Sequence, residues 1–124
     1  MADIPNAGIY VFYENDKPLY VGRSNRMKQR ILEHGRESSG CYSATFAFNL
    51  AKEKLRCKEN YRSLTTRKEL ENAPDFKETY FGERARVAEM KVITIEIHDQ
   101  ILQTLFEVFA HLELKTKYND FRTH

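Results

Sequence analysis

Residues 8–36, GIYVFYENDKPLYVGRSNRMKQRILEHGR, decide the fold that this sequence predicts. GIYVFY is rich in β-branched and aromatic residues, ENDKP has the composition of a turn, and LYVGR is a second short apolar run. Two such runs around a short turn predict an antiparallel hairpin. Strand alternation then places Tyr10 and Phe12 on one face of the hairpin and Ile9 and Val11 on the other.

The residues that follow the hairpin predict a helix with a cationic stripe. Ser24 or Asn25 can serve as its N-cap and Gly35 as its C-terminal stop, so the helix is expected to run to about His34. Its apolar side is expected to comprise Met27, Ile31 and Leu32. A spacing of four residues places a second set on one shared stripe, Arg26, Arg30 and His34.

Three further segments complete the predicted sheet and its helices. Residues 41–55 predict a second helix with Ser43 or a neighbour as cap, and residues 65–87 predict helical pieces broken near Pro74. Residues 89–97 alternate with a period of two and predict a half-buried or central strand. In the helix predicted over residues 41–55, the side chains expected to be buried are Phe46, Leu50 and Leu55. The predicted fold class is α/β or α+β, with a small, mostly antiparallel, three-stranded sheet flanked by helices.

The last predicted element is a long amphipathic helix, which begins at an Asp99 cap and ends near Lys115. Glu107 projects from the middle of the face opposite its apolar arc. The arc comprises Ile101, Leu102, Leu105, Phe106, Val108, Phe109 and Leu112.

The composition is that of a single ordinary globular domain spanning residues 1–124. The chain has 124 residues, 41% hydrophobic and 31% charged, and no apolar run approaches the roughly 20 residues that cross a bilayer. The first residues lack the build of a signal peptide, so a cytoplasmic location is expected and a membrane partner is not. Cys41 and Cys57 are then expected to be free thiols.

The charges are distributed unevenly along the chain. Residues 17–36 carry six basic side chains against one acid, and residues 52–68 carry seven against two. Residues 69–113 reverse this balance, with ten acids and four bases. Such a distribution can present a cationic face to a polyanion such as a phosphate backbone, although solvated helix faces produce the same pattern.

The ordered set of motifs resembles the GIY-YIG nuclease superfamily. GIY is followed by YVG ten residues later, and RSNRMKQRILEHG resembles the family's first helix, with Arg30 at the characteristic arginine. EVFAHLELKTKYN resembles the family's glutamate helix, in which Glu107 matches the metal-binding glutamate and Asn119 the asparagine that follows. The resemblance spans residues 8–119. Residues 37–84 match nothing assignable and are interpreted as a helical insertion of unassigned role.

The resemblance implies a Mg²⁺-dependent endonuclease that hydrolyses DNA phosphodiester bonds, with Mn²⁺ as a substitute metal. Glu107 would be the single carboxylate that anchors the metal, since Mg²⁺ prefers carboxylate, phosphate and water oxygens. Arg30 would contact the non-bridging phosphate oxygens with its permanent charge and fork geometry. A tyrosine would act as general base.

The base is either Tyr10 or Tyr20, with Tyr20 preferred and Tyr10 positioning the attacking water. A free phenol has a pKa of roughly 10 and is a poor base at neutral pH. Nearby cations favour the phenolate, which would explain why tyrosines lie close to Arg23, Arg30 and a metal ion.

Four further residues are candidates for binding the phosphate or supporting the site. Arg23 stands where the family often has lysine; because arginine stays protonated, electrostatic tuning is expected rather than proton relay. His34 could contact phosphate or assist the leaving group, and Arg26 could contact phosphate. Asn119 would brace the site through hydrogen bonds.

Two other classes of function remain open on the sequence alone. The chain could be a catalytically inactive DNA-binding module on the same fold, or a protein-interaction domain without affinity for polyanions. One active site cuts one strand, and the sequence shows no dedicated dimer interface, so a monomer or weak homodimer is expected.

Overall fold

The computed structural model describes residues 4–35, 45–56 and 76–119. The chain forms two compact units, one made of Met1–Glu33 with Met90–His124 and the other of His34–Glu89. The predicted Ser43 cap and the break near Pro74 lie outside the described residues, as do both cysteines. In the part of the chain that the structure describes, each helix is too short or too polar to cross a bilayer.

The first unit is built on a three-stranded antiparallel sheet with the order β2-β1-β3. Its strands are β1 (Gly8–Glu14), β2 (Lys17–Ser24) and β3 (Lys91–Glu96). The β1–β2 hairpin turns at Asn15 and Asp16, whose φ angles of 53° and 64° suit a two-residue primed turn. The predicted fold class and hairpin are confirmed, and β3 lies at the edge of this sheet rather than in its centre.

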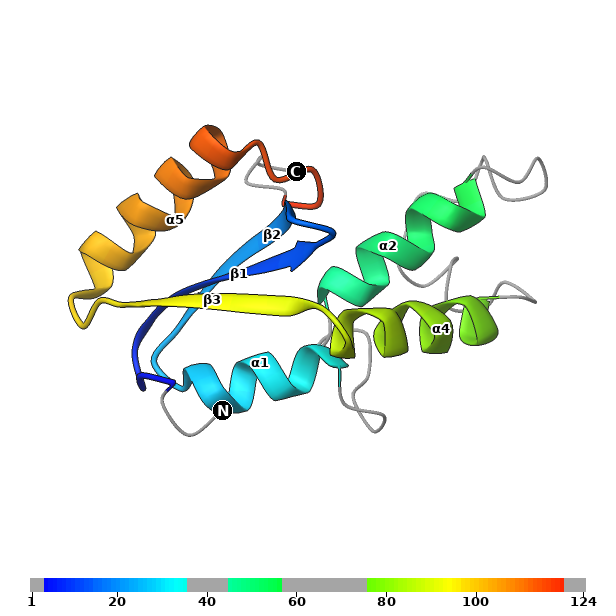
Figure 1. Ribbon diagram of the computed structural model, residues 1–124, viewed down its shortest axis with the longest axis horizontal. Coiled ribbons are helices and arrows are strands. Elements are labelled where there is room, and N and C mark those ends of the chain that lie inside the picture. Colours follow the sequence, from blue (N-terminus) through cyan, green and yellow to red (C-terminus); the bar gives the residue numbers. More distant parts are fainter. Residues whose placement is uncertain (1–3, 36–44, 57–75, 120–124) are drawn as a thin grey trace. The chain divides into compact units, whose positions relative to one another are not determined.

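Two helices of this unit flank the sheet on opposite sides (Figure 1). α1 (Met27–Gly35) begins where the Met27 N–H donates to the Asn6 carbonyl at 2.9 Å. α5 (Gln100–Leu114) begins at the predicted cap, where the Leu102 N–H donates to Asp99 Oδ1 at 3.0 Å. Both predicted helices are confirmed to within two residues at their ends.

The hydrophobic core between the sheet and α5 follows from the alternation of the strands. Ile9, Val11 and Val21 point to this face and pack with Ala110 of α5. Tyr10 and Phe12 point to the opposite face, where their rings meet edge to face at 5.8 Å. The predicted division of β1 into two faces is therefore confirmed.

One expectation about an apolar helix face is wrong, and a second helix, α5, is turned the opposite way from most amphipathic helices. Leu32, predicted to lie on the apolar side of α1 with Met27 and Ile31, is 44% exposed, whereas those two are buried. An amphipathic helix normally turns its apolar arc to the core, but α5 buries Gln103 and Ala110 and exposes most of its arc. The polar side that carries Glu107 faces the sheet instead.

The second unit contains an interacting pair of helices, α2 (Thr45–Arg56) and α4 (Phe76–Ala88). Phe48 and Phe76 pack with ring centroids 5.6 Å apart. The buried Glu83 carboxylate is paired with Lys54 at 2.6 Å and with Arg86 at 3.1 Å. The predicted burial of Phe46 and Leu50 is confirmed; nothing is described of the Leu55 side chain.

Candidate active site

Tyr10 is the most deeply buried of the candidate catalytic residues, with 1% of its surface exposed. It lies opposite Gly22 in the β1–β2 register, and its phenol ring covers that glycine so closely that a Cβ there would overlap Tyr10 Cζ and Oη. The glycine of YVG is therefore required by the tyrosine of GIY. These two motifs are parts of one packing arrangement.

Tyr20 lies on the same face of the hairpin, directly opposite Phe12. Unlike Tyr10, it is only partly buried. The outer edge of β2 is held at the residues before and after Tyr20. Before it, the Tyr118 N–H donates to the Leu19 carbonyl at 3.3 Å. On the other side, Asn119 pairs with the backbone of Val21. The chain after α5 therefore fixes the strand that presents Tyr20.

Asn119 takes the place of a neighbouring strand. Its Oδ1 accepts from the Val21 N–H at 2.8 Å, and its Nδ2 donates to the Val21 carbonyl at 2.7 Å. Asn119 thus holds the backbone of β2 at the residue next to Tyr20.

We expect Asn119→Ala to lower the free energy of unfolding by about 2 kcal/mol, since it removes two hydrogen bonds of roughly 1 kcal/mol each. Asn119→Asp, which can still accept from the Val21 N–H, should lie between this variant and the wild type. Urea denaturation measures both, with the exposed Asn6→Ala as control. Equal stability of Asn119→Ala and the control would contradict a bracing role.

Arg30 extends from α1 to the tyrosine face of the sheet. It is hydrogen-bonded to the Tyr10 side chain, and its Nη1 donates to Glu33 Oε2 at 3.3 Å. Its charge lowers the pKa of both tyrosines. The guanidinium is thus held beside the two phenols by a carboxylate one turn further along the same helix.

Glu107 lies on α5, which packs on the face of the sheet opposite to the two phenols. Its Oε1 lies 3.7 Å from Arg23 Nε on β2. Burial raises the pKa of Glu107, and the charge of Arg23 partly opposes this. The Glu107 charge in turn raises the pKa of Tyr10 and Tyr20. The carboxylate is therefore within electrostatic reach of both phenols, although α5 packs on the opposite face of the sheet. The convergence of residues from β1, β2, α1 and α5 is thus one of charge, with contacts between Glu107 and Arg23 and between Arg30 and Tyr10.

The expected phenolate is not favoured by this arrangement. Burial is the largest influence on both tyrosines and raises the pKa of each above its ordinary value, although Arg30 lowers it. In Tyr10, the neighbouring Tyr20 raises the pKa further. Arg30 acts in the predicted direction, since its charge favours the phenolate, but desolvation outweighs this effect at both tyrosines.

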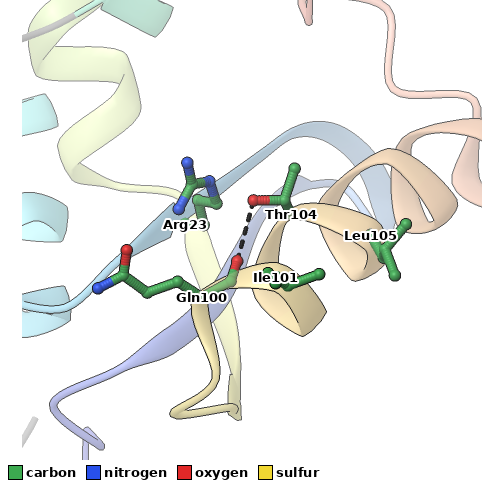
Figure 2. A pocket seen from close by; sticks show the side chains of 5 residues that line it. All are labelled: Arg23, Gln100, Ile101, Thr104 and Leu105. Atoms are coloured by element: carbon green, nitrogen blue, oxygen red, sulfur yellow. Dashed lines mark hydrogen bonds between the residues drawn. The ribbon is translucent and has the colours of Figure 1, made fainter.

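An open hollow of about 350 Å³ adjoins Arg23 on the α5 side (Figure 2). Arg23, Gln100 and Thr104 form its polar side, and the Thr104 hydroxyl donates to the Gln100 carbonyl at 3.0 Å. Ile101 and Leu105 form its apolar side. Arg23 therefore lies between this hollow and Glu107.

Two of the predicted phosphate contacts are not part of this convergence. Arg26 is exposed on α1, where its Nη1 donates to Gln29 Oε1 at 3.1 Å. His34 is fully buried and begins the second unit. Its burial favours a packing role over a phosphate contact.

Sequence reasoning missed one residue pair that supports the site. Gln103 is fully buried one turn before Glu107, and its Nε2 donates to Asn25 Oδ1 at 2.9 Å and to the Ile97 carbonyl at 2.7 Å. These bonds tie the start of α5 to the loop between β2 and α1. The signal was present in the sequence, because Gln103 lies four residues before Glu107 and so shares its helix face.

The described part of the site offers Mg²⁺ one carboxylate ligand, Glu107, and not a complete coordination shell. Among the described residues, no group of three or more His, Cys, Asp or Glu side chains could enclose a metal ion. Mg²⁺ commonly keeps several waters and uses one or two carboxylates together with substrate phosphates. A single partly buried carboxylate suits that mode, in which the substrate completes the site.

Comparison with known proteins agrees with this geometry. The family model described as the GIY-YIG catalytic domain matches residues 6–119, which include every residue of the convergence. Searches of curated proteins and of solved structures gave no significant match. The match covers nearly the whole chain, and this protein therefore belongs to the GIY-YIG catalytic domain family, whose members are nucleases that act on nucleic acid.

Proposed function

We propose that this chain is a Mg²⁺-dependent endonuclease that hydrolyses DNA phosphodiester bonds. The observation that supports this most directly is the convergence of two phenols, one guanidinium and one carboxylate from four separate elements. Phosphodiester hydrolysis needs a deprotonated water, neutralised charge on the phosphoryl oxygens and a stabilised leaving oxygen. These three demands match the side chains present.

Arg30 is the residue that binds the scissile phosphate in this proposal. Its Nη1 already contacts one anionic group, the Glu33 carboxylate, at 3.3 Å. A phosphate that competes for this guanidinium would lie next to the phenols, since Arg30 is bonded to Tyr10. Arg23 and Arg26 are proposed to contact neighbouring phosphates.

Tyr20 is proposed as the general base and Tyr10 as the residue that positions water. The partial exposure of Tyr20 supports this division, because water must reach the base, whereas Tyr10 is buried beneath its neighbours. Glu107 would hold Mg²⁺. The chemistry that this ion supplies when bound is polarisation of the phosphate and stabilisation of the leaving oxygen.

Incubation of the purified chain with single-stranded, duplex and branched DNA tests the proposal. Cleavage is expected with Mg²⁺ or Mn²⁺ and is expected to stop when EDTA is added. A matched RNA strand tests the choice of nucleic acid. If DNA binds with a steep salt dependence but is never cut, the chain is instead the inactive binding module.

We also expect the cleavage rate to rise with pH, by about tenfold per unit between about pH 7 and 9, without a plateau. A base must lose its proton before it can accept one, and burial raises the pKa of Tyr20 above its ordinary value, so the active fraction grows throughout this range. Single-turnover rates at constant ionic strength measure the slope. Tyr20→Phe should lose about 10²-fold or more in rate together with the slope. A rate independent of pH in the wild type would contradict tyrosine as the base.

A further inference from the structure

The outer side of α5 and the adjoining strand β3 form an unusually apolar surface for a small domain. Six large side chains of α5 are between 42% and 73% exposed, and they are Ile101, Leu102, Leu105, Phe106, Phe109 and Leu112. Ile93 and Ile95 of β3 are each 43% exposed. We refer to these eight side chains as the apolar face.

The β3 and α5 parts of the apolar face lie on the same side of the sheet. Ile95 pairs with Ile9, and Ile93 pairs with Val11, so each isoleucine points to the same face as its partner. Ile9 and Val11 belong to the cluster that packs against Ala110 of α5. α5 contacts β2 and β1, and this placement leaves the isoleucines of the edge strand uncovered beside it.

The size of the apolar face is that of a protein interface. An aromatic side chain has about 150–250 Å² to bury, and six of these eight side chains are smaller isoleucines and leucines, so their exposed fractions leave several hundred Å² open on one protomer. A stable complex of standard size buries about 800 Å² on each partner. Monomers rarely expose continuous apolar patches larger than a few hundred Å².

We infer that the apolar face binds a second copy of this chain in a two-fold symmetric dimer. A two-fold contact requires a self-complementary surface, and α5 has one when two copies run antiparallel. Ile101, Leu105, Phe109 and Leu112 are spaced four, four and three residues apart, so the series reads almost the same in both directions. In such a pair Leu105 meets Phe109 of the second copy, and Ile101 meets Leu112.

The charges at the ends of α5 favour the same arrangement. Asp99 caps the N-terminal end and Lys115 caps the C-terminal end. An antiparallel pair sets each aspartate beside the lysine of the other copy and also opposes the two helix dipoles. The polar side of the hollow, with Arg23, would then lie at the rim, as polar groups do in most interfaces.

For function, the consequence is that each dimer carries two candidate active sites, one around each Glu107. Glu107 lies on the opposite face of α5, outside the proposed dimer contact. Association itself does not depend on the proposed nuclease activity and is measured without DNA or metal.

The first test is the mass of the full chain by sedimentation equilibrium. Twice the chain mass of 14.6 kDa is expected at micromolar concentration. Phe109→Glu should weaken association at least about 100-fold, because each substitution appears twice in a symmetric interface. Phe81→Glu, at an exposed phenylalanine of α4 outside the apolar face, is the matched control and should leave the mass unchanged. Circular dichroism checks that both variants fold.

The second test determines how the helices pair. Leu105→Lys alone should also be monomeric, whereas its mixture with Phe109→Glu should dimerise, since the heterodimer has one Glu–Lys contact and one native Leu–Phe contact. A monomeric wild type would overturn the inference, as its apolar face would then be covered within a single chain. A dimer that Phe109→Glu leaves intact, or a mixture that stays monomeric, would overturn it equally.

Discussion

Replacing Glu107 with glutamine is expected to reduce metal-dependent cleavage by about 10³-fold or more and to leave the melting temperature unchanged or higher. The loss of activity follows if this side chain is the protein's only direct ligand to the metal, because a neutral amide holds a hard cation poorly. The effect on stability has the opposite direction because burial raises the pKa of Glu107, which means that folding disfavours its ionised form. Glutamine removes this cost while it keeps the shape of the side chain.

The dependence of this gain on pH gives the prediction a second readout. A group whose pKa is raised in the folded protein contributes stability below its ordinary pKa and loses this contribution as the pH rises. Any gain of Glu107→Gln over the wild type should therefore be present at neutral pH and vanish as the pH falls to about 4, the ordinary pKa of a glutamate. Thermal melts across this range measure it beside single-turnover cleavage.

Glu113→Gln is the matched control, since Glu113 lies exposed on the same helix. It should retain full cleavage and the melting temperature of the wild type. If Glu107→Gln cut DNA as fast as this control, Glu107 would not be the metal ligand. If Glu107→Gln lost activity only together with a large fall in melting temperature, the carboxylate would be structural.

The parts of the fold that local sequence patterns control were predictable. The hairpin, its two faces and the limits of α1 and α5 follow from strand alternation, turn composition and capping residues, all of which act over a few residues. The site residues could be named only through the ordered resemblance to a known family. Individually, Tyr10 or Glu107 resembles any strand tyrosine or helix glutamate.

The parts that depend on distant contacts were not predictable. Helical periodicity correctly divided α5 into an apolar arc and a face with Glu107, but it could not show which face meets the sheet. A helix that supplies a carboxylate to a site must turn that carboxylate inward, and its apolar arc then points outward. The same limit applies to the tyrosines, because the sequence shows their cationic neighbours but not the burial that dominates their pKa.

Substituting Gly22 with alanine is expected to destabilise the chain by about 3 kcal/mol, as overpacking in a tight core does. The new methyl group would overlap the Tyr10 ring at Cζ and Oη, and the buried ring has little room to yield. Cleavage should fall by about 10²-fold in the molecules that remain folded, because a shift of about 1 Å at a reacting group can cost that much. Urea denaturation and cleavage at low temperature measure the two effects.

Gly82→Ala separates this clash from the general effect of losing a glycine. Gly82 lies in α4, where an added Cβ would meet no atom within 4 Å, so alanine should stabilise the helix by about 0.5–1 kcal/mol. A double-mutant cycle then isolates the contact with the ring. In a Tyr10→Val background, which keeps strand propensity but lacks the ring, Gly22→Ala should cost little further stability. If its full cost remained in that background, the requirement for glycine would arise from the strand backbone, and the two motifs would not be coupled through the phenol.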